Sequence, residues 1–180
     1  MANQTKLRLG EIESRAISFS KTWENAKSEK SQGQRFVDTF IRIFRHDSNV
    51  GEFEKPVITP DGKRNYIDFY WKNKIAIEMK SRGKRLDNAF EQLRRYMECL
   101  PEGETPPNLW IVSDFEYIYI YSRTTEQELY FHTKKLRKYI KYFSALADHD
   151  PEPIRADKGI ADQKATAKMN KLFEALQTHG

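Results

Sequence analysis

The strongest constraint on the fold is the pattern of residues 65–80, NYIDFYWKNKIAIEMK. Two runs rich in aromatic and β-branched residues flank the polar turn KNK, which predicts two antiparallel strands joined as a hairpin. A three-residue loop then pairs Trp71 with Ile75 and places Asp68 opposite Glu78. A two-residue loop would instead make the two acids diagonal neighbours.

The facing acids Asp68 and Glu78 require compensation, because like charges opposite each other destabilise a sheet. Lys80 lies on the same face two residues after Glu78, but one ammonium group neutralises only one carboxylate. A shared proton or a divalent cation bound by both carboxylates would relieve the rest. Mg²⁺ suits such oxygen ligands, and a cation next to a lysine is equipped for phosphodiester hydrolysis. The alternative is an exposed hairpin that carries two acids and a lysine without a function.

Hydrophobic periodicity changes along the chain and predicts an α/β (α+β) fold with a central mixed sheet flanked by helices. Spacings of three and four predict helices over residues 9–25, 28–46, 86–100 and 134–147. Alternation predicts strands over residues 52–59, 65–71, 74–80, 109–114, 115–122 and 129–131. One row of tyrosines is expected to pack on the sheet, with base stacking as the alternative: Tyr117, Tyr119 and Tyr121.

Composition predicts one domain over residues 1–147, a linker over 148–160 and an amphipathic helix over 161–180. The last helix has little left to pack on, so we expect the chain to be the front piece of a longer protein. The single cysteine, Cys99, excludes an internal disulfide and a cysteine-rich zinc module. The chain has neither a signal-peptide core nor a run of about 18 apolar residues, so we expect a cytoplasmic protein without a membrane partner.

Positive charge gathers around the hairpin, since ten residues between Lys63 and Arg95 are basic and four are acidic. Phosphate contacts with double-stranded DNA are expected from the basic residues near the acid pair: Lys72, Lys74, Arg82, Lys84, Arg85, Arg94 and Arg95. The alternative is a solvated basic face. A second basic run would either extend the DNA track or form an ordinary helix surface: Lys134, Lys135, Arg137, Lys138 and Lys141.

Two motifs resemble those of a nuclease family. Asp68, nine intervening residues and then Glu78-Met79-Lys80 resemble the D-x9-E-x-K form of the PD-(D/E)xK motif. Gln92 and Tyr96, four apart on the next helix, resemble the Q-x3-Y element of RecB-like nucleases and of type I restriction motor subunits. The alternative for these two is a polar helix edge with a half-buried tyrosine.

Almost the whole chain, from YIDFYWKNKIAIEMK to KATAKMNKLFEAL, resembles the N-terminal portion of MmeI-like single-chain restriction-modification enzymes (type IIL, grouped with type IIG). The resemblance implies a restriction-endonuclease-like PD-(D/E)xK core over residues 1–147, with residues 161–180 as the start of a helical connector. In the full-length chain, an S-adenosylmethionine-dependent methyltransferase and a target-recognition domain would follow. Modification activity is not expected of this chain alone, because it holds neither domain.

The activity implied by the resemblance is Mg²⁺-dependent DNA cleavage in the restriction of foreign DNA, with Mn²⁺ as a substitute. Metal-activated water would leave 5′-phosphate and 3′-hydroxyl ends, and double-strand cutting would require a transient dimer on DNA. The rivals are a free-standing repair or recombination nuclease and an inactive DNA-binding or interaction module of the same fold.

The resemblance also assigns roles to individual residues. Asp68, Glu78 and the Met79 carbonyl would bind the metal, and Lys80 would orient water or stabilise charge. Gln92 and Tyr96 would support the site or contact DNA. A further metal ligand is suggested at Glu29, which matches a position where such nucleases often carry an acid; the alternative is a first-turn glutamate favoured by the helix dipole.

Overall fold

The computed structural model describes residues 7–149 and residue 169. In this part of the chain a six-stranded mixed sheet has the order β1-β2-β3-β4-β5-β6. The strands are β1 (Glu52–Ile58), β2 (Arg64–Trp71), β3 (Ile75–Met79), β4 (Leu109–Ser113), β5 (Tyr117–Ser122) and β6 (Gln127–His132). β3 and β4 are parallel and the other neighbours antiparallel, so the α+β prediction is confirmed and is consistent with a restriction-endonuclease-like domain.

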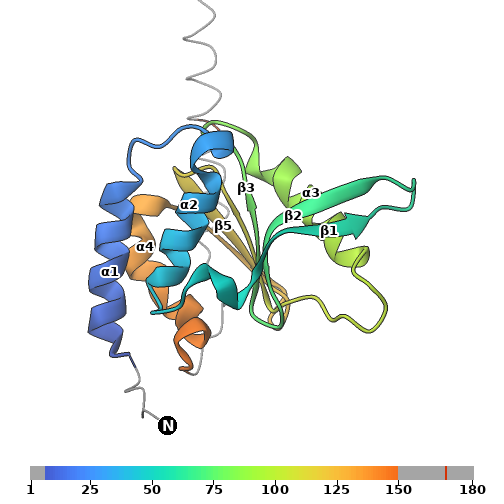
Figure 1. The fold of residues 1–180 in the computed structure, drawn as a ribbon. Helices are drawn as coiled ribbons and strands as arrows, with labels where there is room; N and C mark the ends of the chain where they lie inside the picture. The colour runs from blue at the N-terminus through green and yellow to red at the C-terminus, as the bar shows by residue number, and fades with distance from the viewer. Residues whose placement is uncertain (1–6, 150–168, 170–180) are drawn as a thin grey trace, which may run out of the picture.

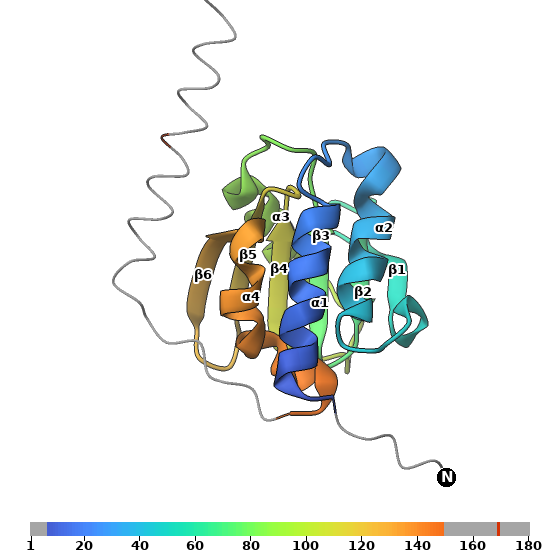
Figure 2. The ribbon, with the colours of Figure 1, turned by 90° about the vertical axis from the view of Figure 1, so that its left-hand side faces the viewer.

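Helices cover both faces of the sheet (Figures 1 and 2). One face carries α1 (Leu9–Thr22), α2 (Glu29–Arg42) and α4 (Leu136–Tyr139), and the other carries α3 (Leu86–Glu98). α3 lies in the crossover between the parallel strands β3 and β4, as such a connection requires. No helix of the described residues is long and apolar enough to cross a membrane.

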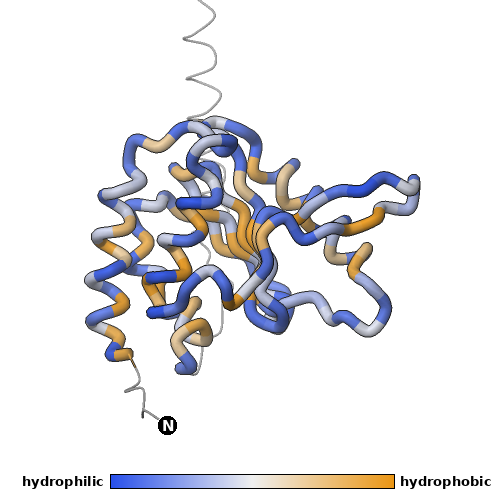
Figure 3. Tube along the Cα trace, in the orientation of Figure 1, coloured by the Kyte–Doolittle hydropathy of each residue, from blue (hydrophilic) through white to orange (hydrophobic). Residues whose placement is uncertain are grey.

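Two hydrophobic clusters fill the layers on either side of the sheet, where Figure 3 shows the hydrophobic segments gathering along the strands. On the α1 and α2 side, the Phe36 ring meets Phe19 and Phe115 edge-on at 4.8 and 5.2 Å. On the α3 side, Tyr119 is buried with its ring 4.7 Å from that of Phe90. The tyrosines of β5 thus pack on the sheet as expected.

The β2–β3 hairpin has the predicted register, with Trp71 paired to Ile75 and Phe69 to Ile77. Asn73 in the turn adopts a left-handed backbone with φ of 63°, a conformation that asparagine tolerates better than most residues. The three-residue loop is therefore confirmed.

The segment 134–147 does not form the single α-helix that its spacing predicts. It consists of η2 (Thr133–Lys135), α4 and a longer 3₁₀ helix, η3 (Ile140–Ala147). Ile140, Phe143 and Leu146 recur every three residues, and a helix of three residues per turn places all of them on one buried face. A further 3₁₀ turn, η1 (Ser48–Val50), precedes β1. The expected connector helix and nearly all of the expected linker lie outside the described residues.

Gly51, between η1 and β1, lies against β2 without room for a side chain. A Cβ atom there would lie 2.5 Å from Phe69 Cζ and 2.8 Å from Tyr70 O. We expect Gly51→Ala to lower the free energy of unfolding by about 2 kcal/mol, because Phe69 is fully buried and cannot retreat.

The matched control is Gly33→Ala in α2, where the new Cβ would meet Met79 at an ordinary 3.6 Å. That change should be neutral or stabilise the protein by up to about 1 kcal/mol, since alanine favours a helix. Urea denaturation measures both variants, and equal stabilities would contradict the prediction.

Candidate active site

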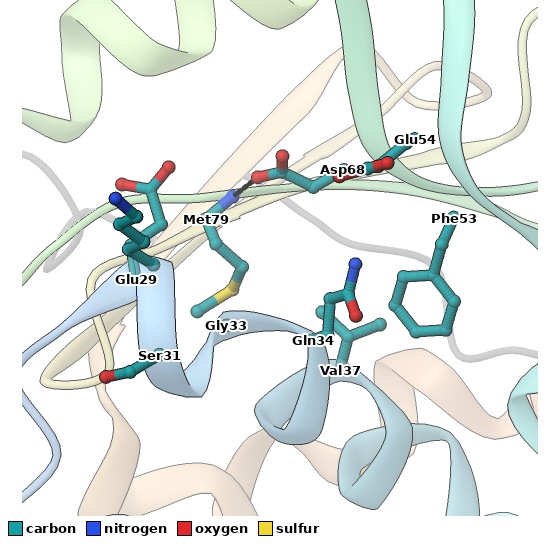
Figure 4. Close-up of a pocket in the computed structure, with 10 residues that line it drawn as sticks. Glu29, Ser31, Gly33, Gln34, Val37, Phe53, Glu54, Asp68 and Met79 are labelled. Atoms are coloured by element: carbon teal, nitrogen blue, oxygen red, sulfur yellow. Dashed lines mark hydrogen bonds between the residues drawn. The ribbon is translucent and has the colours of Figure 1, made fainter.

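Asp68 lies where β2 loses its backbone partners on both sides. On the β1 side, Glu54 occupies the position opposite Asp68 in the register but adopts a left-handed φ of 53° instead of pairing. On the β3 side, the paired positions end at Phe69 and Ile77. The Asp68 side chain, instead of its backbone, bonds to β3 at this point: Oδ2 accepts a hydrogen bond from Met79 N at 2.6 Å (Figure 4).

The same break reorients the side chains of β2. Ile67 and Phe69 are two residues apart and would share one face of a regular strand. Ile67 instead packs in the α3-side cluster, whereas Phe69 packs in the α2-side cluster. The strand therefore turns over at Asp68, which brings its carboxylate to the end of β3 rather than to a position directly opposite Glu78.

Glu78 is buried, with 2% of its surface exposed. Its Oε1 accepts hydrogen bonds from Lys80 Nζ at 2.7 Å and from Gln92 Nε2 at 2.9 Å. Its Oε2 is buried without a hydrogen-bond partner in the described structure. A buried carboxylate oxygen without a donor is costly, so this atom would be stabilised by a proton or by a cation beside it.

Burial raises the pKa of Glu78 to about 7, and repulsion from Asp68 adds to the rise while Lys80 opposes it. Burial also raises the pKa of Asp68, against the Met79 hydrogen bond. Burial lowers the pKa of Lys80, but the surrounding carboxylates, Glu78 first, outweigh it and the net pKa is raised. Lys80 is thus held as an ammonium ion, and the carboxylate pair retains an affinity for a proton or a cation near neutral pH.

The Q-x3-Y pair supports the buried carboxylate. Gln92 Nε2 also donates to Tyr96 Oη at 2.9 Å, and Tyr96 Oη donates to Asn65 Oδ1 at 3.3 Å. Asn65, on β2, was not singled out by the sequence patterns. Asn65 could have been identified from its spacing. It is a polar residue two positions before the buried Ile67, so both side chains point to the α3 side of β2.

Glu29 sits in the first turn of α2 and is tied to the loop after β3. Its Oε2 accepts from Ser81 N at 3.1 Å, and its own backbone N donates to Ser81 Oγ at 3.2 Å. Glu29 also lines a cavity of about 360 Å³ together with Asp68 and Glu54 (Figure 4). This position is compatible with both expectations for Glu29. One is a first-turn acid that the helix dipole favours, and the other is an acid close to a bound metal.

The donor set for a metal ion is small. No group of three or more His, Cys, Asp or Glu side chains within residues 7–149 is arranged to hold one. The carboxylate oxygens at the site are those of Asp68 and Glu78, with the unpartnered Oε2 among them, and Glu29 and Glu54 line the cavity beside Asp68. Because hard divalent cations prefer oxygen ligands and retain several waters, this set fits Mg²⁺ better than a softer metal.

Two of the basic residues expected near the acids lie elsewhere. Lys72 and Lys74 occupy the β2–β3 turn, which precedes β3, whereas Lys80 follows the last residue of β3. Lys74 Nζ donates to Ala145 O at 2.8 Å and lies 3.5 Å from an Asp148 oxygen. The expectation that these two lysines surround the carboxylates is wrong, because strand direction separates the turn from the site.

Arg82 follows Lys80 closely, but its guanidinium is occupied within the fold. Nε donates to Ala26 O and Nη2 to Glu24 O, both at 2.7 Å, and Nη1 lies 3.6 Å from Glu116. With 25% of its side chain exposed, Arg82 clamps the α1–α2 connection to the end of β3.

The remaining basic residues are exposed. Lys84 and Arg85 lie on the loop that leads from β3 into α3, Arg95 lies on α3, and Arg94 pairs with Glu91 at 2.8 Å. The second basic run lies beside α1, where two of its members form ion pairs, Lys134 with Glu24 and Arg137 with Glu13.

The family model described as MmeI, N-terminal domain, matches residues 14–179 of the chain. The match spans all of the site residues described above. No curated protein and no solved structure matches the chain.

Proposed function

Because the chain belongs to the family of MmeI N-terminal domains, which are components of restriction-modification enzymes, we propose that it is the Mg²⁺-dependent DNA endonuclease domain of such an enzyme. The observation that carries this proposal is the half-buried Asp68 and the buried Glu78 beside the Lys80 ammonium, with Glu78 Oε2 unpartnered. The substrate is double-stranded DNA, and hydrolysis leaves 5′-phosphate and 3′-hydroxyl ends.

Asp68, Glu78 and the Met79 carbonyl hold the metal in this proposal, with Glu29 close enough to the cavity to assist. A bound Mg²⁺ would neutralise charge on the scissile phosphate and make water more acidic. Gln92 fixes Glu78 through Oε1, which leaves Oε2 free for the metal.

Lys80 acts as an electrostatic stabiliser. Its raised pKa keeps the ammonium charged at neutral pH, where it can attract the phosphate and the negative charge that develops on it. A charged ammonium has no lone pair with which to accept a proton, so the raised pKa of Lys80 favours this role over that of a general base.

The DNA contacts nearest to the site would come from Lys84, Arg85, Arg94 and Arg95, whose side chains are exposed on and before α3. In the restriction-modification context, the methyltransferase and target-recognition domains of a longer chain would supply sequence specificity, and a transient dimer on DNA would supply the second active site. A complete acid pair with its lysine favours an active nuclease over the inactive-module alternative.

The test is a calorimetric titration of Mg²⁺ or Mn²⁺ into the wild-type chain and into Asp68→Ala, with nicking of supercoiled plasmid followed in the same samples. We expect cation binding and cation-dependent nicking in the wild type and the loss of both in the variant. Asp47→Ala is the matched control, because Asp47 is an exposed acid outside the cavity.

The outcomes separate the alternatives. Wild-type cation binding that does not depend on Asp68 would mean that the hairpin acids are ordinary charges, and the nuclease proposal would fail. Asp68-dependent cation binding without any nicking would favour an inactive module of the same fold.

A further inference from the structure

The β1–β2 hairpin projects from the body of the domain as an arm, here defined as residues 55–67 (Figure 1). Its inner face packs toward α3, since Val57 and Ile67 are buried in the α3-side cluster. Side chains alternate along a strand, so the opposite face is the one that carries Pro56, Ile58, Arg64 and Tyr66. We call these four residues the outer face of the arm.

The outer face combines apolar surface with a cation. Ile58 is 68% exposed and Tyr66 is 47% exposed, and both rank among the exposed large hydrophobic residues of the described chain. Arg64 is exposed as well, and its guanidinium lies 5.8 Å from the centre of the Tyr66 ring. Neighbouring exposed apolar side chains mark an interaction surface more often than isolated ones do.

The outer face of the arm and the cavity lie on the same side of the sheet, opposite α3. The cavity is lined by α2 and by Phe53, Glu54 and Asp68, and α2 lies on the sheet face opposite α3. Tyr66 lies two residues before Asp68, and Arg64 lies four residues before it. At about 3.3 Å per residue, these separations are about 7 and 13 Å along β2. On duplex DNA with a rise of about 3.4 Å per base pair, this corresponds to about two to four base pairs from the phosphate at the site.

The arm is anchored rather than free to swing. Asn65 Nδ2 donates to Thr59 Oγ1 at 3.0 Å across the arm, and Asn65 Oδ1 accepts from Tyr96, which is bonded to Gln92. Gln92 in turn donates to Glu78. One chain of hydrogen bonds therefore ties the inner face of the arm to Glu78 and fixes the position of the arm.

We propose that the outer face of the arm contacts the minor groove of double-stranded DNA within a few base pairs of the cleaved phosphate. Tyr66 and Ile58 lie against sugars and base edges, and Arg64 binds a backbone phosphate. Apolar side chains combined with arginine are the groups that proteins place in the minor groove. This inference rests on the proposed function, because it takes DNA as the substrate.

DNA is favoured over a protein partner for two reasons. The outer face lies on the same two strands as Phe53, Glu54 and Asp68, which line the cavity, so a duplex that reaches the cavity would pass close to the arm. Arg64 is also the cation of the outer face, and it lies next to Lys63 at the tip of the arm. A second protein surface remains as an outcome of the test below.

The experiment measures the affinity of a fluorescein-labelled 30-base-pair duplex by anisotropy, with Ca²⁺ in place of Mg²⁺ so that the DNA stays intact. The variants are Arg64→Ala and the double variant Ile58→Ser with Tyr66→Ala, all at exposed positions. We expect at least a tenfold weaker affinity for the double variant and about a threefold to tenfold weaker affinity for Arg64→Ala. Leu9→Ala on α1, at a residue that is 49% exposed, is the matched control and should leave the affinity unchanged.

A second readout is the photo-crosslinking amino acid benzoylphenylalanine at position 66, which we expect to form an adduct with the labelled duplex. Variants that bind and nick DNA like the wild type would overturn the inference and leave the nuclease proposal standing. A crosslink to a second copy of the chain instead of DNA would overturn it in favour of a protein partner. A wild-type chain that neither binds the duplex nor nicks plasmid would overturn both proposals.

Discussion

Glu78→Gln is expected to abolish cation-dependent nicking and, at the same time, to make the fold more stable above neutral pH. The buried Glu78 carboxylate lies near Asp68, and its Oε2 has no hydrogen-bond donor. Glutamine keeps the shape and still accepts from Lys80 and Gln92, but it removes the charge. The active site would thus lose its metal ligand and the fold would lose a source of instability, a trade-off found where function requires strained groups.

The pH dependence follows from the pKa of Glu78, which burial and Asp68 raise from 4.5 to about 7 in the folded chain. The folded state holds this proton more tightly than the unfolded state does, so the stabilising contribution is complete below pH 4.5. It is lost as the pH rises to about 7. Each pKa unit corresponds to about 1.4 kcal/mol, so ionised Glu78 destabilises the wild type by about 3 kcal/mol above neutral pH.

Urea denaturation at pH 4, 6 and 8 measures the effect. We expect Glu78→Gln to exceed the wild type by up to about 3 kcal/mol at pH 8 and to match it at pH 4. Glu91→Gln is the matched control, because Glu91 is exposed on α3 and should change stability by at most about 0.5 kcal/mol. A Glu78→Gln variant that is less stable than the wild type at pH 8 would show that the carboxylate is already neutralised within the fold.

Arg82→Ala is expected to lower the free energy of unfolding by about 3 kcal/mol. The variant leaves the carbonyls of Ala26 and Glu24 without their donor and breaks the approach to Glu116. Hydrogen bonds to a charged group are each worth about 1.5 to 3 kcal/mol, and two are lost. Arg82→Lys should recover little, since an ammonium cannot reproduce the planar fork that reaches both carbonyls.

Thermal unfolding of Arg82→Ala beside Arg85→Ala checks this prediction. Arg85 belongs to the same loop but is exposed, so its loss should change stability by about 0.5 kcal/mol or less. If Arg82→Ala unfolds at the wild-type temperature and only weakens DNA binding, then Arg82 is a DNA contact, as the charge pattern suggested, and the clamp is unimportant.

The local order of the sequence was enough to predict the strands and the hairpin register. The turn KNK sets the pairing of Trp71 with Ile75, and a register is specified by contacts between residues close in the chain. The mixed sheet followed from the change of period between the helical and strand segments. Apolar residues spaced three apart were less informative about the type of helix. The spacing of Ile140, Phe143 and Leu146 suits both an α-helix and the 3₁₀ helix that forms.

Within the candidate site, the motif identified Asp68, Glu78, Lys80, Gln92 and Tyr96, and the structure brings these residues together or links them by hydrogen bonds. The spacing could not reveal that β2 turns over at Asp68, or that Asn65 completes the chain through Tyr96. Nor could it separate Arg82, clamped to distant carbonyls, from its exposed neighbours.

The sequence by itself was enough to predict the six strands, the first three helices, the hairpin and the candidate acid pair, because these depend on propensity, period and spacing over a few residues. Only the tertiary structure decided the burial of Glu78 and its raised pKa. It also decided that Arg82 and Lys74 bond to backbone carbonyls within the fold. Burial and charge depend on which distant segments pack over a group. α3 is placed over β3, and the α1–α2 connection against its end, by the assembled core and by nothing within the local sequence.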